Sequence, residues 1–157
     1  MNPKPQAVSV RPMTTADLDQ VIEIAESLSQ APRWPRSAYL TALDPNATPR
    51  RIALVAQGLA ANSVAGFAVA SLIPPQAELE MIAVAPPAQR HGVARALFAA
   101  LAAELRAALV TEVILEVRAS NQPALELYRR IDFVVSGHRK RYYQSPVEDA
   151  VQMRLRL

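Results

Sequence analysis

Cysteine is absent from the 157-residue sequence, so the chain can form no disulfide, no cysteine zinc site and no thiolate nucleophile. Histidine is scarce: His91 and His138 lie far apart and neither has a partner at metal-ligand spacing. We therefore expect no metal site. The first residues, Met1 to Pro5, contain no apolar signal core, and no run approaches about 18 apolar residues. These absences lead us to expect a soluble, cytoplasmic protein that does not enter a membrane.

A strong charge of either sign is also lacking. Seventeen Lys and Arg against 14 Asp and Glu give a net charge of +3, which is far weaker than that of a dedicated nucleic-acid binder. Apolar residues make up 51% of the chain and charged residues 20%, which excludes a disordered protein. The length favours one domain with a core large enough to be stable without disulfides or metal.

The hydrophobic pattern predicts an α/β domain. Apolar runs and alternating residues indicate strands at 7–11, 51–56, 64–73, 78–84, 112–117, 133–135 and 151–157. Helical spacing indicates helices at 15–29, 35–43, 92–109 and 123–130. Hairpins predict antiparallel pairing among the early strands, and the strand–helix–strand units predict parallel pairing in the second half. We expect a flexible tail at 1–6 and a single domain at 7–157.

A loop between a strand and a long helix carries the first functional signal. It reads Gln89-Arg90-His91-Gly92-Val93-Ala94-Arg95. Such a junction points unpaired backbone N–H groups and the positive end of the helix dipole at one spot. Gly92 permits close approach of a ligand, and Arg90 and Arg95 add positive charge. The loop meets the requirements of a pyrophosphate site, although an ordinary strand-to-helix turn is the alternative.

This loop resembles the coenzyme A signature of the GNAT acetyltransferases, Gln/Arg-x-x-Gly-x-Gly/Ala. Gln89, Gly92 and Ala94 match it in order. Leu115 to Asn121, followed by Ala124 to Tyr128, resembles one branch of the superfamily, the ribosomal-protein-alanine N-acetyltransferases, which acetylate the N-terminal amine of a protein. The likeness spans most of the chain and is dense after residue 77. It departs from the branch where Arg33-Trp34-Pro35 replaces a Pro-Trp-Ser-like segment.

The resemblance implies a mixed, splayed sheet flanked by about four helices. Acetyl-CoA would lie between the strands that end near Val84 and Val117. The backbone of the segment Ile82, Ala83 and Val84 would pair with the pantetheine and acetyl group, and the loop 89–95 would hold the pyrophosphate. Asn121 is implied as a further cofactor contact, but it stands just before a helix and is equally well placed to cap it.

Acetyl transfer to an amine requires that the ammonium lose a proton, that the carbonyl be polarised and that the leaving thiolate be protonated. Glu116 ends a buried strand and could take the amine proton, while Tyr128 on the next helix could donate to the sulfur. The resemblance assigns the same roles. The alternatives are a structural role for Glu116, paired with Arg118 or with a nearby amide, and a core position for Tyr128 with its hydroxyl hydrogen-bonded. Glu78, on an earlier strand, is a competing base, at the position used by histone-type members.

Several residues are candidates for the acceptor site. Glu80 shares the strand face of Glu78 and could line a groove, and Trp34 could wall it or simply pack down. Tyr142 and its neighbour Tyr143 could grip a peptide backbone, or they could be ordinary strand aromatics. The basic stretch 138–141 is best explained as a solvated edge.

We expect acetyl-CoA as cosubstrate and a protein or peptide N-terminus as acceptor. Nucleic acid would be met only indirectly, through a ribosomal substrate. A small-molecule amine acetyltransferase and a CoA-binding module without turnover are the two alternatives, and the sequence does not identify the oligomeric state.

Overall fold

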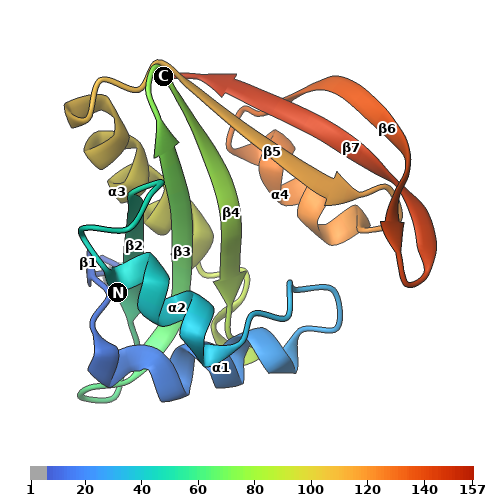
Figure 1. Cartoon of the computed structure of the whole chain (residues 1–157). Helices are drawn as coiled ribbons and strands as arrows, with labels where there is room; N and C mark the ends of the chain where they lie inside the picture. Colours follow the sequence, from blue (N-terminus) through green and yellow to red (C-terminus); the bar gives the residue numbers. More distant parts are fainter. Residues whose placement is uncertain (1–6) are drawn as a thin grey trace, which may run out of the picture.

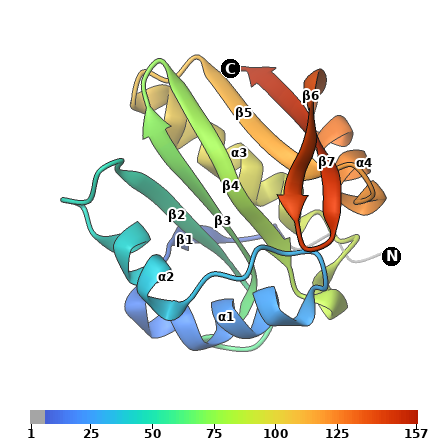
Figure 2. The same cartoon turned by 45° about the vertical axis from the view of Figure 1, so that its right-hand side comes forward.

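A seven-stranded mixed sheet, in the order β1-β2-β3-β4-β5-β7-β6, forms the frame of the molecule in this computed structural model, which describes residues 7–157 (Figures 1 and 2). The strands are β1 (Val10–Pro12), β2 (Arg51–Gln57), β3 (Val64–Ile73), β4 (Gln76–Val84), β5 (Glu112–Arg118), β6 (Val134–Gln144) and β7 (Val147–Arg156). Within this range the α-helices are α1 (Leu18–Ser27), α2 (Arg36–Leu43), α3 (Val93–Ala107) and α4 (Gln122–Arg130). The predicted α/β class, mixed sheet and four helices are confirmed, and the tail expected at 1–6 lies outside the described residues.

Helices cover the sheet on both faces. α3 and α4 pack on one face, and α1 and α2 pack on the other face of β2 to β4 (Figure 1). The first core contains the buried stripe of α3, which consists of Val93, Leu97, Phe98, Leu101, Ala102 and Leu105. The period-3.6 pattern of the sequence predicted this helix because a single apolar stripe must face the sheet.

The sheet divides between its two central strands. β4 and β5 run parallel and pair only between Gln76–Glu78 and Glu112–Ile114, after which they separate (Figures 1 and 2). β5 then continues as a strand by pairing with β7 along its whole length. The edge of β4 from Leu79 to Val84 therefore has no strand partner on the side of β5.

The C-terminal strands differ from the prediction in length and in direction. β6 and β7 form one long antiparallel hairpin, and β7 lies between β5 and β6 and runs antiparallel to both. Parallel pairing is confirmed for β4 with β5 but is wrong for the unit β5-α4-β6. The strand predicted at 133–135 extends to Gln144 because hydrogen bonds to β7 hold it, although its side chains are mostly exposed and lack an apolar alternation.

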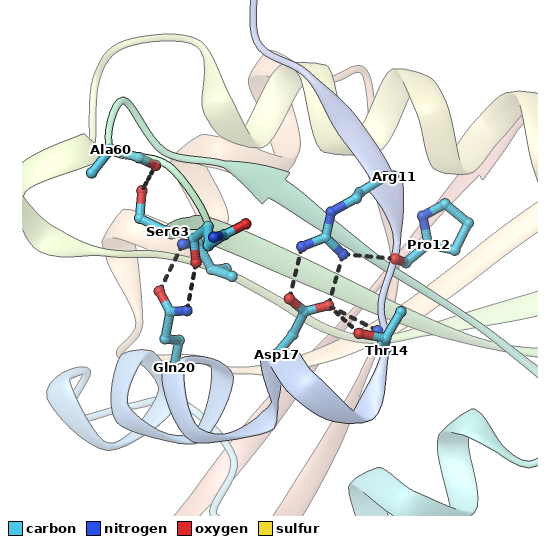
Figure 3. Close-up of polar contacts among 9 residues, drawn as sticks. Arg11, Pro12, Thr14, Asp17, Gln20, Ala60 and Ser63 are labelled. Carbon is cyan, nitrogen blue, oxygen red and sulfur yellow. Dashed lines mark hydrogen bonds and ion pairs between the residues drawn. The ribbon is translucent and has the colours of Figure 1, made fainter.

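The helix predicted at 15–29 is split at its start. Thr15–Asp17 form a 3-10 turn, and α1 begins at Leu18. Thr14 is the N-cap of this turn, and a capping box joins it to Asp17. Arg11 of β1 donates two hydrogen bonds of 2.8 Å to the Asp17 carboxylate, whose side chain is 6% exposed (Figure 3). One carboxylate thereby fixes the first strand to the first helix.

Asp17→Asn should weaken this junction. The hydrogen bond from Arg11, and secondarily that from the Thr14 backbone, lowers the pKa of Asp17, so its stabilising effect is present above the ordinary aspartate range and is lost as the pH falls through the lowered value. We expect a loss of roughly 1–3 kcal/mol in the free energy of unfolding at pH 7, measured by urea titration. The difference between variant and wild type should shrink at pH 3, and an equal loss at both pH values would contradict this role.

Candidate active site

A β-bulge in β4 sets the direction of the side chains along this strand. The register passes from Val69 opposite Met81 to Ala70 opposite Leu79, so Glu80 is the extra residue. Leu79 packs in the core beneath α3, whereas Met81 packs in the core beneath α1 and α2. Glu78 and Glu80 flank Leu79 and so point to the opposite face, and the extra residue brings Met81 to that same face.

The free edge of β4 presents backbone groups at two of the predicted cofactor residues. The N–H of Ala85 donates to the carbonyl of Ala65 in β3 at 2.8 Å. By alternation the backbone N–H and C=O of Ala83 also point towards β3. The backbone groups of Ile82 and Val84, the residues on either side of Ala83, therefore point away from β3. Ile82 and Val84 are thus the two positions at which an extended ligand can add to this edge.

The loop that follows β4 is tied back to the end of the strand. The side chain of Gln89 donates to the Val84 carbonyl at 3.1 Å. The loop then turns through positive φ angles at Arg90 (63°) and Gly92 (80°), and α3 begins at Val93. Arg90 and His91 are exposed, and a Cβ placed on Gly92 would meet no atom within 4 Å.

The start of α3 offers unpaired donors to the open space before this loop. The first helical hydrogen bond runs from the Ala96 N–H to the Gly92 carbonyl at 3.0 Å. The N–H groups of Val93, Ala94 and Arg95 precede it and have no acceptor within the helix. The Val93 side chain is buried, and the Arg95 guanidinium donates to the Arg130 carbonyl at 3.3 Å, which links the loop to the end of α4. The residues fit a pyrophosphate through their backbone and through the free charge of Arg90.

Glu116 is held by the C-terminal hairpin rather than by its neighbour Arg118. The register places it opposite Gln152 of β7, whose amide donates to Glu116 Oε1 at 3.2 Å. The Nε of Arg139, on β6, lies 3.0 Å from the same oxygen. Of the two partners that the alternative reading offered, the nearby amide is present as Gln152, whereas Arg118 pairs with Glu148 instead.

Glu78 is a half-buried carboxylate beside Glu116. Burial raises its pKa, the charges of Glu80 and Glu116 raise it further, and the charges of Arg51 and Arg139 oppose the rise. Glu80, in contrast, is engaged by Arg51, whose Nε lies 2.7 Å from Glu80 Oε2. Among residues 7–157, no side-chain hydrogen bond or ion pair is formed by Glu78. Of the two acidic residues expected in the acceptor groove, Glu78 is the available one.

A wide bulge in β6 brings Tyr142 to the carboxylates. Arg139 pairs with Ala150 and Tyr143 with Glu148, so three residues of β6 stand opposite Asp149 alone. The backbone N–H of Arg141, which has a φ of 54°, donates to Asp149 Oδ1 at 2.9 Å. Interaction with the Glu116 carboxylate raises the pKa of Tyr142, whose side chain is otherwise exposed. This places Tyr142 at the rim of the site.

Tyr128 and Asn121 belong to the opposite face of the sheet, on α4. Tyr128 packs beside Phe133, with ring centroids 5.8 Å apart, and burial raises the pKa of Tyr128 to about 12. Asn121 Oδ1 accepts from the Ala124 N–H at 3.3 Å, so the predicted helix cap is confirmed, while its amide N–H groups can still meet a ligand. Asn121 follows the end of β5 that has separated from β4, and Tyr128 lies in the second turn of α4.

Trp34 does not join this cluster. Its ring packs on Tyr39, with centroids 5.4 Å apart, and Tyr39 donates to Met81 Sδ at 3.8 Å. Packing down is therefore what the structure shows, and contact with an acceptor stays a prediction. The structure also adds Arg139 and Gln152, which the sequence did not single out, because they reach Glu116 only through strand register.

The described part of the chain contains no helix long and apolar enough to cross a membrane. Within the same residues, no cluster of three or more His, Cys, Asp or Glu is arranged to hold a metal ion.

A divided α/β sheet whose central strand leads into a helix start with unpaired backbone N–H groups is the combination that places the chain in a class of proteins. The family model described as the acetyltransferase (GNAT) family matches residues 18–133, and the chain belongs to this family. The resemblance noted from the coenzyme A signature is thereby confirmed.

Several of the similar proteins are named N-acetyltransferases. The ribosomal protein bS18-alanine N-acetyltransferase of Escherichia coli is 40% identical over 96 residues, which cover 60% of this chain but only 65% of that relative. N-alpha-acetyltransferase RimI of Mycobacterium tuberculosis is 32% identical over 154 residues, which cover 95% of this chain and 92% of the relative. The crystal structure of the ribosomal-protein-S18-alanine N-acetyltransferase from Escherichia coli superposes with a TM-score of 0.79 at 30% identity, covering 96% and 94% of the two chains.

Substitutions of Gly92 should separate backbone strain from charge at the cofactor loop. Gly92→Glu places an anion before the N-terminus of α3 and should weaken acetyl-CoA binding by one to two orders of magnitude, about 1.4–2.8 kcal/mol. Gly92→Ala is the matched control, because its Cβ meets no neighbour and only the positive φ is penalised. Calorimetry should show a smaller loss for Gly92→Ala, and equal losses for both variants would argue against an anion site.

Proposed function

We propose that this chain transfers the acetyl group of acetyl-CoA to a primary amine, and that the amine is the N-terminus of a protein, most naturally a ribosomal protein. The observation that carries the proposal is the divided sheet: the free edge at Ile82 and Val84 runs directly into the loop before α3, and Glu78 and Glu116 face the space where β4 and β5 separate. The names of the relatives support the choice of a protein N-terminus.

Acetyl-CoA, when bound, supplies the activated acetyl group. Ile82 and Val84 would hold its extended arm by their backbone groups, and the N–H groups of Val93, Ala94 and Arg95 would hold its pyrophosphate. Arg90 adds a free positive charge at the same end. Asn121 would contribute its amide N–H groups from the start of α4.

Glu116 is our choice of general base. It is the carboxylate whose position is fixed, since Arg139 and Gln152 both hold Oε1, and a base must be oriented towards the amine that it deprotonates. Glu78 lies beside it and carries a charge that no cation of the described chain pairs directly. It would attract the acceptor's ammonium and hold it near Glu116.

Tyr128 is our choice of proton donor. A pKa of about 12 keeps its phenol protonated at neutral pH, so the hydroxyl is able to donate to a leaving sulfur. Tyr142, exposed at the rim and in contact with Glu116, would lie against the first residues of the acceptor. A cytoplasmic location, where ribosomal proteins are made, stays a prediction from the sequence.

The proposal is tested by incubating the protein with acetyl-CoA and matched acceptors while free thiol is measured. The acceptors are a peptide with an N-terminal Ala, the same peptide with a blocked N-terminus and one internal Lys, and a panel of small amines. We expect turnover with the free N-terminus alone. Turnover confined to the small amines would favour the small-molecule alternative. If none of the acceptors, of any class, leads to thiol release, the proposal is overturned.

Glu116→Gln and Glu78→Gln should affect different kinetic constants. Glu116→Gln removes the base and should lower kcat/KM by about 10²–10⁴-fold through kcat. Glu78→Gln should act mainly on the KM of the acceptor, since it removes an attraction to the ammonium. The reverse pattern, with kcat lost in Glu78→Gln and kept in Glu116→Gln, would exchange the two roles.

Thermal unfolding provides a control that is independent of activity. Because burial raises the pKa of Glu78 in the folded state, the wild type should lose stability as the pH rises from the ordinary glutamate range through the raised value. Glu78→Gln lacks this loss, so its melting temperature should gain on that of the wild type across the same window. If the melting temperatures of Glu78→Gln and wild type change with pH in the same way from pH 4 to pH 8, Glu78 is not buried as described.

A further inference from the structure

The ion pair between Arg118 and Glu148 joins the end of β5, the β6–β7 hairpin and the loop before α4. Arg118 is the last residue of β5, two positions after Glu116, and Glu148 lies near the start of β7. Arg118 NH1 and Glu148 Oε2 lie 3.4 Å apart, and the side chains are 25% and 18% exposed. None of the roles assigned above uses this pair.

Arg118 reaches into the turn of the β6–β7 hairpin. Its guanidinium donates to the carbonyls of Pro146 and Ser145 at 3.2 and 3.4 Å. The same group lies over the Tyr143 ring, 4.3 Å from the ring centroid. A planar guanidinium can satisfy these carbonyls and stack on an aromatic ring at the same time, whereas a lysine ammonium cannot.

Glu148 holds the other side of the junction. Its Oε1 accepts from the Ser120 N–H at 2.6 Å, and Ser120 lies in the short loop between β5 and α4. In the same loop the Asn121 N–H donates to the Arg118 carbonyl at 3.0 Å, and the Asn121 side chain caps α4. Glu148 therefore connects the hairpin directly to the beginning of the helix that carries Tyr128.

Tyr143 connects the pair to the rim of the site, because the Arg118 guanidinium lies over its ring. Tyr143 also packs edge-on against Tyr142, with centroids 5.1 Å apart. A displacement of Arg118 would consequently move the Tyr143 ring and, through it, Tyr142 at the rim of the site.

We propose that Arg118 and Glu148 are positioning residues for acetyl transfer, which fix Tyr128 relative to Glu116 by clamping the hairpin turn, the Tyr143 ring and the start of α4 together. This inference rests on the proposed function. Glu116 and Tyr128 come from opposite faces of the sheet and from consecutive elements, so their separation depends on the loop at 119–121. The clamp is the set of side-chain contacts that holds this loop.

Kinetics of Arg118→Met test the clamp, since Met keeps most of the length but has neither charge nor donors. A displacement of about 1 Å at a reacting group can cost about 10²-fold in rate, so we expect kcat to fall by about 10–100-fold. The affinity for acetyl-CoA, measured by calorimetry, should fall much less than kcat, because the loop 89–95 lies elsewhere and Asn121 is the one proposed cofactor contact that the clamp touches. Arg118→Lys should recover little of the lost kcat, since an ammonium cannot stack on the Tyr143 ring and donate to the two turn carbonyls at the same time.

The same substitution in a Tyr128→Phe background distinguishes positioning from general damage. Tyr128→Phe alone should lower kcat by about 10²-fold or more. If Arg118 acts through Tyr128, the double variant should be no more than about twofold slower than Tyr128→Phe. Multiplied losses would show that Arg118 supports the fold without positioning this group.

Arg11→Met is the matched control. Arg11 also forms a partly buried pair with a carboxylate, Asp17, but in the N-terminal part of the chain (Figure 3). It should lower the melting temperature yet leave kcat unchanged well below that temperature. A kcat loss in Arg11→Met equal to that in Arg118→Met would overturn the positioning role.

Amide hydrogen exchange tests the clamp without requiring activity. Glu148→Ala removes the acceptor of the Ser120 N–H and should speed exchange there and in the first turn of α4, whereas Glu148→Gln retains an acceptor oxygen and should not. Equal protection in Glu148→Ala and wild type would remove the structural basis of the clamp. If the two variants show this contrast but the wild type acetylates no acceptor, the proposed function is contradicted and the clamp is still supported.

Discussion

β4 and β5 can share hydrogen bonds over only three residue pairs, and the other features of the site depend on this limit. Pairing ends at Glu78 opposite Ile114, immediately before the bulge at Glu80. A bulge bends its strand and increases the local twist, so β4 follows β3 while β5 follows β7. Because the backbone groups of Ile82 and Val84 are left without a strand partner, the free edge and the two facing carboxylates have one common cause.

The bulge also decides which carboxylates face the separated strands. Without an extra residue, Met81 would lie on the α3 side and the strand would continue its alternation in the other phase. With it, Glu78, Glu80 and Met81 all lie towards α1 and α2, and the strand still ends where α3 must begin. A local irregularity of one residue therefore aligns the acidic side chains with the edge that leads to the helix start.

Local sequence rules predicted the elements that local physics controls. The stripe of α3, the continuous apolar run of β3 and the cap at Asn121 each depend on residues within a few positions of one another, and all three are confirmed. The glycine of the loop is explained in the same way, since Gly92 has a φ of 80°.

The sequence could not predict the features that depend on register between distant strands. β6 is a surface edge strand without apolar alternation, and its bulge at 140–142 has no sequence signal. The partners of Glu116 and Arg118 follow from that register, which is why Arg118 was considered as a partner of Glu116 and is found with Glu148. Trp34 illustrates the same limit, because only the tertiary fold brings it against Tyr39.

Around the divided sheet, three arginines each pair with one carboxylate. Within residues 7–157, Glu78 is the neighbouring carboxylate that has no such partner. Arg51 pairs with Glu80, Arg139 with Glu116 and Arg118 with Glu148, each drawn from a different strand. A half-buried carboxylate without a paired cation destabilises the fold, so an arrangement that neutralises its neighbours and spares Glu78 is best explained by a cation that arrives later. We propose that an acceptor ammonium would supply that charge, beside the Glu116 carboxylate that Arg139 and Gln152 of the hairpin hold in position.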